Sequence, residues 1–460
     1  MSLQENNSHF QRLYEQTPES RSYHERARNV TPLGVESNVR AMKPYPFYLG
    51  KADGSYVYDI DGNEYLDFLM GLGPGILGHN YPAVVERVKS QIDDCGSTAA
   101  LPQTIAIEVM EQIKSMTPSI EQVRLANSGT EATMHAIRVA RSYSGKSKIA
   151  KPEGGYAGAH DYALQSVSAS EDALGAEQNP ETVPYGTGIP DEIRDTVVAF
   201  PFNDKEATED ILRKHADDLA CVIIEPVMAS CGVLPPSDGY HEFLRELTEE
   251  LDILLIWDEV MTGFRLGPGS AQGRFGVTPD MTTLAKVAGG GYQLAAFGGK
   301  AEIMAEIEPP TENPKDKWKT SAFHGGTYNG HPVSCAAGLA TLEILENEPV
   351  FEHIEPLAER LFDGLQEAAD DAGVAASVQY IGSMGTVFMM DHQPTTQRET
   401  WTADADQFRD WWFEAAADGV LFGNDDQYER FFTSYTNTEA EIDHALEVAE
   451  DAFRSIRADE

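Results

Sequence analysis

The sequence predicts an α/β protein with a large domain built on a mostly parallel sheet and a smaller α+β domain. In the middle of the chain, short apolar runs at residues 197–200, 221–224 and 253–257 are separated by helical patterns. Such runs indicate βαβ units, whose parallel strands are covered by helices on both faces. Toward the C-terminus, strand patterns at residues 386–390 and 431–434 lie among helices. That arrangement favours a second domain of the α+β class.

The remaining elements indicate how the chain is divided. Residues 54–60 and 65–68 show strand patterns joined by Asp61-Gly62, a dipeptide typical of hairpin turns. Residues 82–115 carry a helical pattern, and residues 392–406 are expected to form a long surface insertion. We therefore expect a polar N-terminal tail at 1–30, a small domain from 31–85 and 331–460, and a large domain at 86–330.

The composition is strongly acidic. The chain has 460 residues, with 34 Lys and Arg against 75 Asp and Glu, which gives a formal net charge of −41. This balance argues against binding to nucleic acid or to anionic membranes, because Lys and Arg hold both. The acids recur along the whole chain, for example at residues 206–210, 217–218 and 367–371. The pattern favours a halophilic protein of a salt-rich cytoplasm. The alternative is an ordinary acidic protein with an acidic tail.

Cysteine usage and the N-terminus also favour a cytoplasmic protein. Four cysteines without CxxC spacing suggest reduced thiols, namely Cys95, Cys221, Cys231 and Cys335. Residues 1–20 lack the apolar run of a signal peptide. No stretch approaches the roughly 18 apolar residues of a membrane span.

A phosphate-binding segment is predicted at the start of one helix. Asn127, Ser128, Gly129, Thr130 and Glu131 directly precede or begin a helical pattern. Two of them supply hydroxyls, and the glycine permits close approach to the backbone. A helix start also offers free N–H groups and a positive dipole end, which together bind phosphate. The alternative for this segment alone is a simple N-cap with an acid in the first turn.

An acid and a lysine follow two other predicted strands. Asp258 comes directly after the apolar run 254–257, where a carboxylate must be paired, solvated or used. Lys286 lies between apolar residues ahead of a glycine run at 289–291, where loss of water makes an amine a better nucleophile. A structural ion pair is the alternative for the acid, and a surface lysine is the alternative for Lys286. The 12 histidines are scattered, so no metal site is expected.

These three features fit one cofactor. Open α/β sheets bind ligands at the carboxyl ends of their strands, where the sequence places all three. A phosphate cradle, an acid and a lysine in this order suit pyridoxal 5′-phosphate (PLP). Its phosphate would lie on the helix start, its ring nitrogen would pair with the acid, and its aldehyde would form a Schiff base with the lysine.

Three strings of the sequence resemble the class III PLP-dependent aminotransferases. They are VRLANSGTEATMHAIRVAR at 123–141, LLIWDEVMTGFR at 254–265 and GVTPDMTTLAKVAGGG at 276–291. The resemblance runs from about Thr31 to the end, within the subgroup of glutamate-1-semialdehyde aminomutase and the β-amino-acid (β-phenylalanine type) aminotransferases. It implies fold type I with a PLP-binding large domain, and a homodimer, or a tetramer, with active sites at the subunit interface.

The resemblance also implies roles for single residues. Lys286 would be the Schiff-base lysine and general acid/base, and Asp258 would pair with the ring nitrogen. The other residues implied to bind the cofactor are Ser128, Gly129 and Thr130 at the phosphate, Tyr156 and Val260 on the two ring faces, Glu225 at the hydroxyl side of the ring, and Gly326 and Thr327 at the phosphate of the partner subunit.

Three residues are candidates for binding the substrate. Arg40, in SNVRAM, matches an arginine of the aminomutase that binds a substrate carboxylate, a task that suits a guanidinium. Glu429, in DQYERFF, matches an acid near the substrate, and Arg430 is a neighbouring candidate for carboxylate binding. The alternative for Arg40 is a surface ion pair, and the alternative for Glu429 and Arg430 is a solvated surface charge.

Departures from the aminomutase pattern fall on the substrate side. Leu72 replaces a tryptophan, Ala157 replaces a histidine and Ser230 replaces an asparagine. The segment KIAKPEGGYAGAHDYA is closer to the β-amino-acid aminotransferases. We therefore predict an aminotransferase that moves an amino group from an amino acid or amine, including β- or ω-amino acids, to an oxo acid. The alternatives are the glutamate-1-semialdehyde 2,1-aminomutase of tetrapyrrole synthesis and a non-catalytic scaffold, which an intact Lys286 and Asp258 disfavour.

Overall fold

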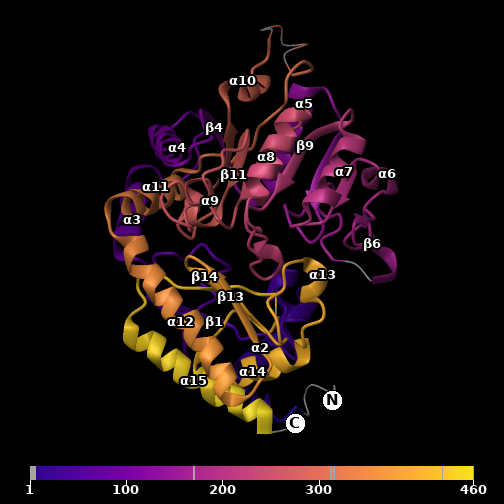
Figure 1. The fold of residues 1–460 in the computed structure, drawn as a ribbon. Coiled ribbons are helices and arrows are strands. Elements are labelled where there is room, and N and C mark those ends of the chain that lie inside the picture. Colours follow the sequence, from indigo (N-terminus) through magenta and orange to yellow (C-terminus); the bar gives the residue numbers. More distant parts are fainter. Residues whose placement is uncertain are drawn as a thin grey trace. The chain divides into compact units, whose positions relative to one another are not determined.

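The computed structural model describes residues 7–168, 171–310, 313, 316, 318–426 and 428–458 (Figure 1). The chain forms two compact units. Unit 1 contains Met1–Tyr81, Val350–Gln393 and Glu399–Glu460, and unit 2 contains Pro82–Pro349 and Pro394–Arg398. Neither unit is a single continuous stretch of chain.

Unit 2 is built on a seven-stranded sheet with the strand order β4-β12-β11-β10-β9-β5-β8. Five neighbouring strands, from β8 to β11, run parallel, while β12 is antiparallel to both β11 and β4. The predicted α/β class with a mostly parallel sheet is confirmed. The strands are β4 (Gln122–Ala126), β5 (Lys148–Pro152), β8 (Val197–Phe200), β9 (Leu219–Ile224), β10 (Leu254–Glu259), β11 (Met281–Leu284) and β12 (Ala295–Gly299).

Helices accompany this sheet, and the helical pattern at 82–115 forms two of them, separated by residues 96–103. A small hairpin of β6 (Gly175–Ala176) and β7 (Asn179–Pro180) lies outside the main sheet. The helices of unit 2 are α3 (Pro82–Cys95), α4 (Thr104–Met116), α5 (Gly129–Ser144), α6 (Asp191–Arg194), α7 (Lys205–His215), α8 (Tyr240–Glu250), α9 (Ser270–Phe275), α10 (Ala301–Met304) and α11 (Pro332–Asn347), with 3-10 turns η4 (Glu171–Ala173), η5 (Ala229–Cys231), η6 (Lys286–Gly289) and η7 (Ala305–Ile307).

Helix α11 shifts the expected division of the chain. The sequence placed it in the small domain, which was expected to resume at residue 331. In the structure α11 packs against α3, α4 and η6, and most of its side chains are buried there. Unit 2 therefore extends to Pro349, because this largely apolar helix is covered by elements that precede it in the chain.

Unit 1 joins the two ends of the chain in one sheet with the order β1-β2-β3-β15. The predicted turn at Asp61-Gly62 connects the antiparallel strands β2 and β3, and β15 pairs in parallel with β3. A second sheet has the order β13-β14-β16. The strands are β1 (Leu49–Asp53), β2 (Tyr56–Asp59), β3 (Glu64–Asp67), β13 (Ser377–Ile381), β14 (Met384–Phe388), β15 (Val420–Leu421) and β16 (Phe431–Phe432).

The N-terminal segment forms two helices from Gln11 onward rather than a polar tail. Phe10 and Leu13 are buried, and the Phe10 ring lies 5.7 Å from that of Tyr45 and 5.0 Å from that of Phe413. The apolar pair at i and i+3 gives this short helix a face that the core covers. The helices of unit 1 are α1 (Gln11–Gln16), α2 (Pro18–Ala27), α12 (Val350–Ala372), α14 (Ala405–Ala417) and α15 (Glu439–Ala458), with 3-10 turns η2 (Pro32–Gly34) and η3 (Asn38–Arg40); α13 (Gln397–Thr400) begins in unit 2 and ends in unit 1.

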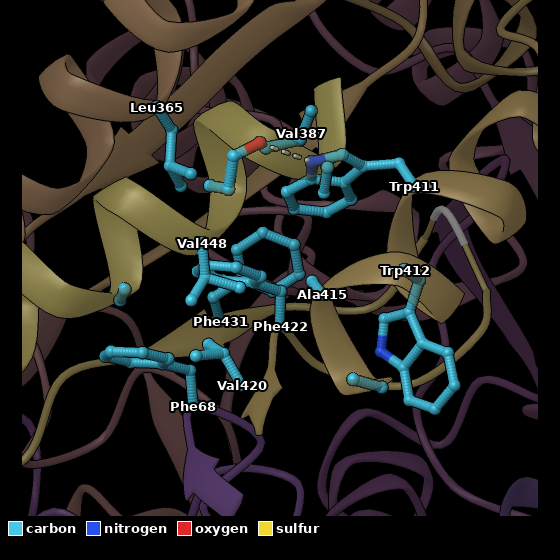
Figure 2. Packing of buried hydrophobic residues seen from close by; sticks show 14 of the residues in the cluster. Phe68, Leu365, Val387, Trp411, Trp412, Ala415, Val420, Phe422, Phe431 and Val448 are labelled. Atoms are coloured by element: carbon cyan, nitrogen blue, oxygen red, sulfur yellow. Dashed lines mark hydrogen bonds between the residues drawn. The ribbon is translucent and has the colours of Figure 1, made fainter. Parts of the chain in front are cut away.

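Aromatic side chains fill the core of unit 1 (Figure 2). The ring of Trp411 stacks 5.0 Å from those of Phe422 and Phe453, and its indole Nε1 donates to the Ala449 carbonyl at 3.3 Å. Rings in stacked contact add about 0.5–1.5 kcal/mol beyond burial. In the part of the chain that the structure describes, no helix is long and apolar enough to cross a membrane.

A buried histidine of unit 2 makes folding pH-dependent. The His241 ring is packed 4.8 Å from Trp257 and 5.0 Å from Phe275, and its Nε2 donates to the Pro226 carbonyl at 2.7 Å. Burial lowers the pKa of His241 to about 4. The unfolded chain therefore binds this proton more readily, and stability is lost as pH falls from about 6.5 toward 4.

We predict that protonation of His241 in the unfolded chain lowers the free energy of unfolding by about 2 kcal/mol as the pH falls from 7 to 5. Urea unfolding of wild type and His241→Gln at several pH values should show curves that converge as the pH falls. The exposed His444, changed to Gln, is the control and should leave the wild-type curve unchanged. Parallel curves for wild type and His241→Gln would contradict the assignment.

Candidate active site

The carboxyl ends of four strands of unit 2 bring the predicted cofactor residues to one edge of the sheet. Ile224 is paired with Trp257, and Asp258 is paired with Thr283, so Glu225, Asp258 and Lys286 lie at or just beyond the carboxyl ends of three neighbouring parallel strands. Strand β4 ends at the same edge, because Ala126 pairs with Ala295 of β12, whose next residue pairs with Leu284 of β11. Asn127 and the start of α5 therefore lie at this edge too.

Asp258 is a buried acid held by neutral donors. Its Oδ1 accepts from the Thr283 hydroxyl at 2.9 Å and from the Val260 backbone N–H at 3.1 Å. Burial, and then the charge of Glu225, raise the pKa of Asp258 to about 7, whereas the two hydrogen bonds and Lys286 act in the opposite direction. A cation placed against this carboxyl would restore its charged form.

The start of α5 has the form of a phosphate cradle. Ser128 is the N-cap in an extended conformation, and its Oγ accepts from the Glu131 N–H at 3.2 Å. A Cβ atom on Gly129 would lie 2.9 Å from both methyl carbons of Val260, so only glycine lets the helix start approach that side chain. The Thr130 hydroxyl accepts from the Ala159 N–H at 3.0 Å. The free N–H groups of this turn can therefore receive an anion.

Tyr156 and Glu225 are joined by hydrogen bonds through Ser230. The Tyr156 N–H donates to Glu225 Oε1 at 3.3 Å and to the Ser230 hydroxyl at 3.1 Å. Ser230 donates to the Glu225 carboxylate with its hydroxyl and with its N–H, the latter at 3.2 Å. Burial raises the pKa of the Tyr156 phenol, and a hydrogen bond with the Thr130 side chain opposes that rise. The ring of Tyr156 thus lies beside the helix start.

Lys286 has an unusual backbone conformation. It begins η6 directly after β11 with φ of 48°, in the left-handed region that lysine rarely adopts. Such strain persists only where surrounding structure enforces it, and it clusters at functional sites. Gly290, four residues on, has φ of 56°, and a Cβ there would lie 2.1 Å from the Thr341 hydroxyl of α11. The buried turn therefore fixes the backbone of Lys286, from which its half-buried side chain extends.

Gly326 and Thr327 lie on an exposed loop that is attached to the start of α5. The Asn127 side chain donates to Asn329 Oδ1 at 2.8 Å, and Asn329 Nδ2 lies 3.1 Å from His324 Nε2. A Cβ on Gly326 would lie 2.6 Å from Asn329 Oδ1. The role of this loop toward a partner subunit remains a prediction.

The three candidate substrate residues belong to unit 1. Arg40 lies in η3, is exposed and pairs with Glu36 at 3.2 Å. The mostly buried guanidinium of Arg430 lies 3.7 Å from the Glu429 carboxylate and donates to the Tyr428 carbonyl at 3.4 Å. The ion pair considered as the alternative for Arg40 is therefore present, whereas Glu429 and Arg430 are mostly buried rather than solvated at the surface. The substrate-binding roles of all three stay predictions.

Sequence reasoning missed several residues that support this site. Ser230 was noted only as a departure from the aminomutase pattern, yet it contacts both Tyr156 and Glu225. Gln397 and Arg398 lie within the expected surface insertion but belong to unit 2 and are largely buried there. Their side chains are polar and follow no period, so the sequence held no signal for their contacts.

The chain belongs to the class III aminotransferases, because the model of that family matches residues 38–453. The glutamate-1-semialdehyde 2,1-aminomutase of Persephonella marina is 40% identical over 94% of this chain and 97% of its own length. That of Methanocaldococcus jannaschii is 38% identical over 95% of this chain and 98% of its own length. This protein is therefore an enzyme of the aminotransferase class.

Solved structures agree with this assignment. An omega-transaminase from Sphaerobacter thermophilus has a TM-score of 0.89 and 32% identity, covering 97% of this chain and 99% of its own. The β-phenylalanine aminotransferase from Variovorax paradoxus has a TM-score of 0.84 and 26% identity, covering 96% and 95%. A glutamate-1-semialdehyde aminomutase from Pseudomonas aeruginosa PAO1, in complex with PMP, has a TM-score of 0.86 and 25% identity, covering 96% of each chain. The protein has fold type I, and its cofactor is PLP.

The residues at the sheet edge fit this cofactor. The cradle at Gly129 would be closed by any side chain, Asp258 is a buried acid that accepts from a hydroxyl and a backbone N–H, and Lys286 is held in a strained turn at the same edge. PLP supplies an electron-withdrawing ring that stabilises charge at the reacting carbon. The protein supplies the anion-binding helix start, the acid and the amine.

We predict that Gly129→Ala weakens PLP binding roughly 5- to 100-fold. The new Cβ would crowd Val260, and overpacking costs about 1–3 kcal/mol. The dissociation constant of PLP from the apoenzyme, measured by absorbance titration, tests this. The double variant Gly129→Ala/Val260→Ala makes room for the added methyl and should recover part of the lost affinity. Unchanged affinity in a folded Gly129→Ala protein would count against the cradle.

We predict that PLP affinity of the apoenzyme falls as pH drops below about 7. Protonation of Asp258 removes the charge that would face the ring nitrogen, and the loss approaches about tenfold per pH unit. PLP titrations between pH 5 and 8 should show this component in wild type and lack it in Asp258→Asn, which binds more weakly throughout. Glu259, whose pKa burial also raises to about 7, is present in both proteins and cancels in the comparison. The same pH profile in both would refute the assignment.

Proposed function

We propose that this protein is a glutamate-1-semialdehyde 2,1-aminomutase. The observation that carries the proposal is that relatives 37–41% identical over 93–95% of this chain bear that name. The sequence-based prediction favoured transfer of an amino group to an oxo acid. Membership of the aminotransferase class stands, and for the reaction itself these relatives favour the alternative, in which the amino group returns to the same carbon skeleton.

The site residues support this reaction through their positions. Lys286 begins a fixed turn at the sheet edge, where its amine can hold the cofactor and move a proton at the reacting carbon. Asp258 faces the ring nitrogen in our proposal, because its carboxyl is buried among neutral hydrogen-bond donors and its charged form needs a cation. Ser128, Gly129 and Thr130 receive the phosphate.

The remaining cofactor roles are proposed on the same basis. Tyr156 lies beside Thr130 and would cover the ring, while Val260, in contact with Gly129, would support its other face. Glu225 lies next in the row of strand ends and would face the hydroxyl side of the ring.

The partner and substrate contacts complete the proposal. Gly326 and Thr327, on an exposed loop, would serve the phosphate of a partner subunit, which makes the protein a homodimer at least. Arg40, Glu429 and Arg430 would lie near the substrate and its carboxylate. Work in a salt-rich cytoplasm remains a prediction from the charge of −41.

Transfer to an oxo acid is the second candidate function. Ser230 and Ala157, with Leu72, alter the substrate side relative to the aminomutase pattern, and Ser230 contacts both Tyr156 and Glu225. The solved omega-transaminase is also 32% identical to this chain. Because of these observations, the experiment also tests transfer of the amino group to a separate oxo acid.

One experiment separates the two reactions. The PLP- or PMP-loaded enzyme, given glutamate-1-semialdehyde and no oxo acid, should form 5-aminolevulinate, because a diamine intermediate that stays bound leaves one amino group with the enzyme and keeps the other in the product. Product is followed by its condensation to a coloured pyrrole, and Lys286→Ala is the inactive control. An enzyme that forms no 5-aminolevulinate but moves amino groups from β- or ω-amino acids to pyruvate or 2-oxoglutarate, with ping-pong kinetics, would overturn the aminomutase proposal.

A further inference from the structure

A short segment from the C-terminal part of the chain forms part of unit 2. Residues Pro394–Arg398 belong to that unit, although the residues on either side belong to unit 1. The carbonyl of Thr395 accepts from the Asn203 side chain at 3.0 Å. The side chains of Gln397 and Arg398 make polar contacts within unit 2, where Gln397 is only 8% exposed. The segment is therefore an anchored part of unit 2 and not a free surface loop.

Arg398 holds the residue that follows β5. Its Nε and Nη2 donate to the two carboxylate oxygens of Glu153 at 2.8 and 2.9 Å, and its Nη1 donates to the Gly175 carbonyl at 3.0 Å. The Glu153 carboxylate is buried, and the guanidinium is mostly so. A bidentate ion pair of this kind fixes the orientation of the Glu153 carboxylate as well as its distance from the guanidinium. It therefore sets the path of the chain as β5 enters the next turn.

Gln397 closes the same turn from another side. The Cys231 thiol donates to Gln397 Oε1 at 2.7 Å and to the Gly154 carbonyl at 3.3 Å. Gly154 has φ of 87°, and a Cβ there would lie 1.6 Å from Gln397 Oε1 and 2.7 Å from Cys231 Sγ. The amide of Gln397 thus rests against bare backbone, and only glycine allows the contact.

The turn held in this way carries Tyr156 and contacts Ser230, which binds Glu225. The Ser230 hydroxyl lies 3.2 Å from the Gly154 carbonyl and bonds the Glu225 carboxylate. Two residues further on, the Tyr156 N–H donates to both Ser230 and Glu225. A displacement of Gly154 would therefore move the Tyr156 ring and loosen the donors around Glu225.

We propose that Gln397 and Arg398 are positioning residues for the active site, which hold the turn of residues 153–156 so that Tyr156 and Glu225 face the cofactor correctly. The inference rests on the proposed roles of Tyr156 and Glu225, but not on which amino compound reacts. Neither Gln397 nor Arg398 is a catalytic residue, because both act through Glu153, Gly154 and Cys231.

The test uses full-length protein and three variants. Arg398→Met removes the ion pair with Glu153, and Arg398→Lys keeps the charge without the bidentate geometry. Gln397→Ala removes the contacts of the Gln397 amide with Gly154 and Cys231 without changing any charge. The matched control is Arg213→Met, because Arg213 makes the same two-pronged contact with Glu250, at 2.8 and 2.9 Å, on the exposed surface of α7. Stability of each variant is measured by urea unfolding.

Three readouts show positioning rather than simple support of the fold. They are the dissociation constant of PLP, the circular dichroism of bound PLP, and kcat and KM for the amino compound that wild type accepts. Misplacement near 1 Å can cost up to about 100-fold, so we expect kcat to fall by up to that factor in Arg398→Met and less in Arg398→Lys. The dichroism of PLP should change in Arg398→Met and Gln397→Ala, while Arg213→Met matches wild type.

The outcomes distinguish this inference from the proposed function. Folded Arg398→Met and Gln397→Ala proteins with wild-type PLP affinity, dichroism and kcat would overturn it. If Arg398→Met fails to fold, Gln397→Ala and Arg398→Lys decide by the same readouts. An enzyme that makes no 5-aminolevulinate disproves the aminomutase proposal and leaves the dichroism and affinity results valid as they stand.

Discussion

Keeping a charged carboxylate inside a buried sheet edge is the constraint on which the rest of the site depends. Asp258 has lost its water, and nearby Glu225 adds repulsion, so its proton is held up to about pH 7. Two neutral hydrogen bonds and Lys286 oppose this only in part. The arrangement of parallel strands gives the remedy, because their ends place a helix start, an amine and an acid around one space that a zwitterionic cofactor can fill.

Sequence patterns predicted the central strands well, and the reason is physical. Strand β8 has the bounds that its apolar run indicated, and β9 and β10 differ by one or two residues at their ends, since a buried parallel strand must be apolar on both faces. Helix α11 is apolar around most of its surface, so its sequence predicts burial but not which unit covers it. The N-terminal helices were missed because α1 offers only Leu13 and its N-cap Phe10 as an apolar face, and α2 buries only Ser20.

The candidate site divides in the same way. Lys286, Asp258 and the residues at the start of α5 follow directly from strand ends and a helix start, which local sequence predicts. Ser230, Gln397 and Arg398 act through long-range contacts with a backbone carbonyl, a buried thiol and a buried acid, respectively. Those contacts exist only once the fold has formed, and a polar residue in a loop gives no period from which to infer them.

The path of the chain has a consequence for biosynthesis. Most of unit 2 is complete once Pro349 has been made, yet the turn after β5 awaits Arg398, which is translated some 245 residues after Glu153. Until then Glu153 has no guanidinium beside it, and the turn that carries Tyr156 is not yet held in place. A nascent chain, or a fragment released early from the ribosome, would therefore carry the lysine and the acid without the geometry to use them. Completion of the polypeptide itself would act as the last step of active-site assembly.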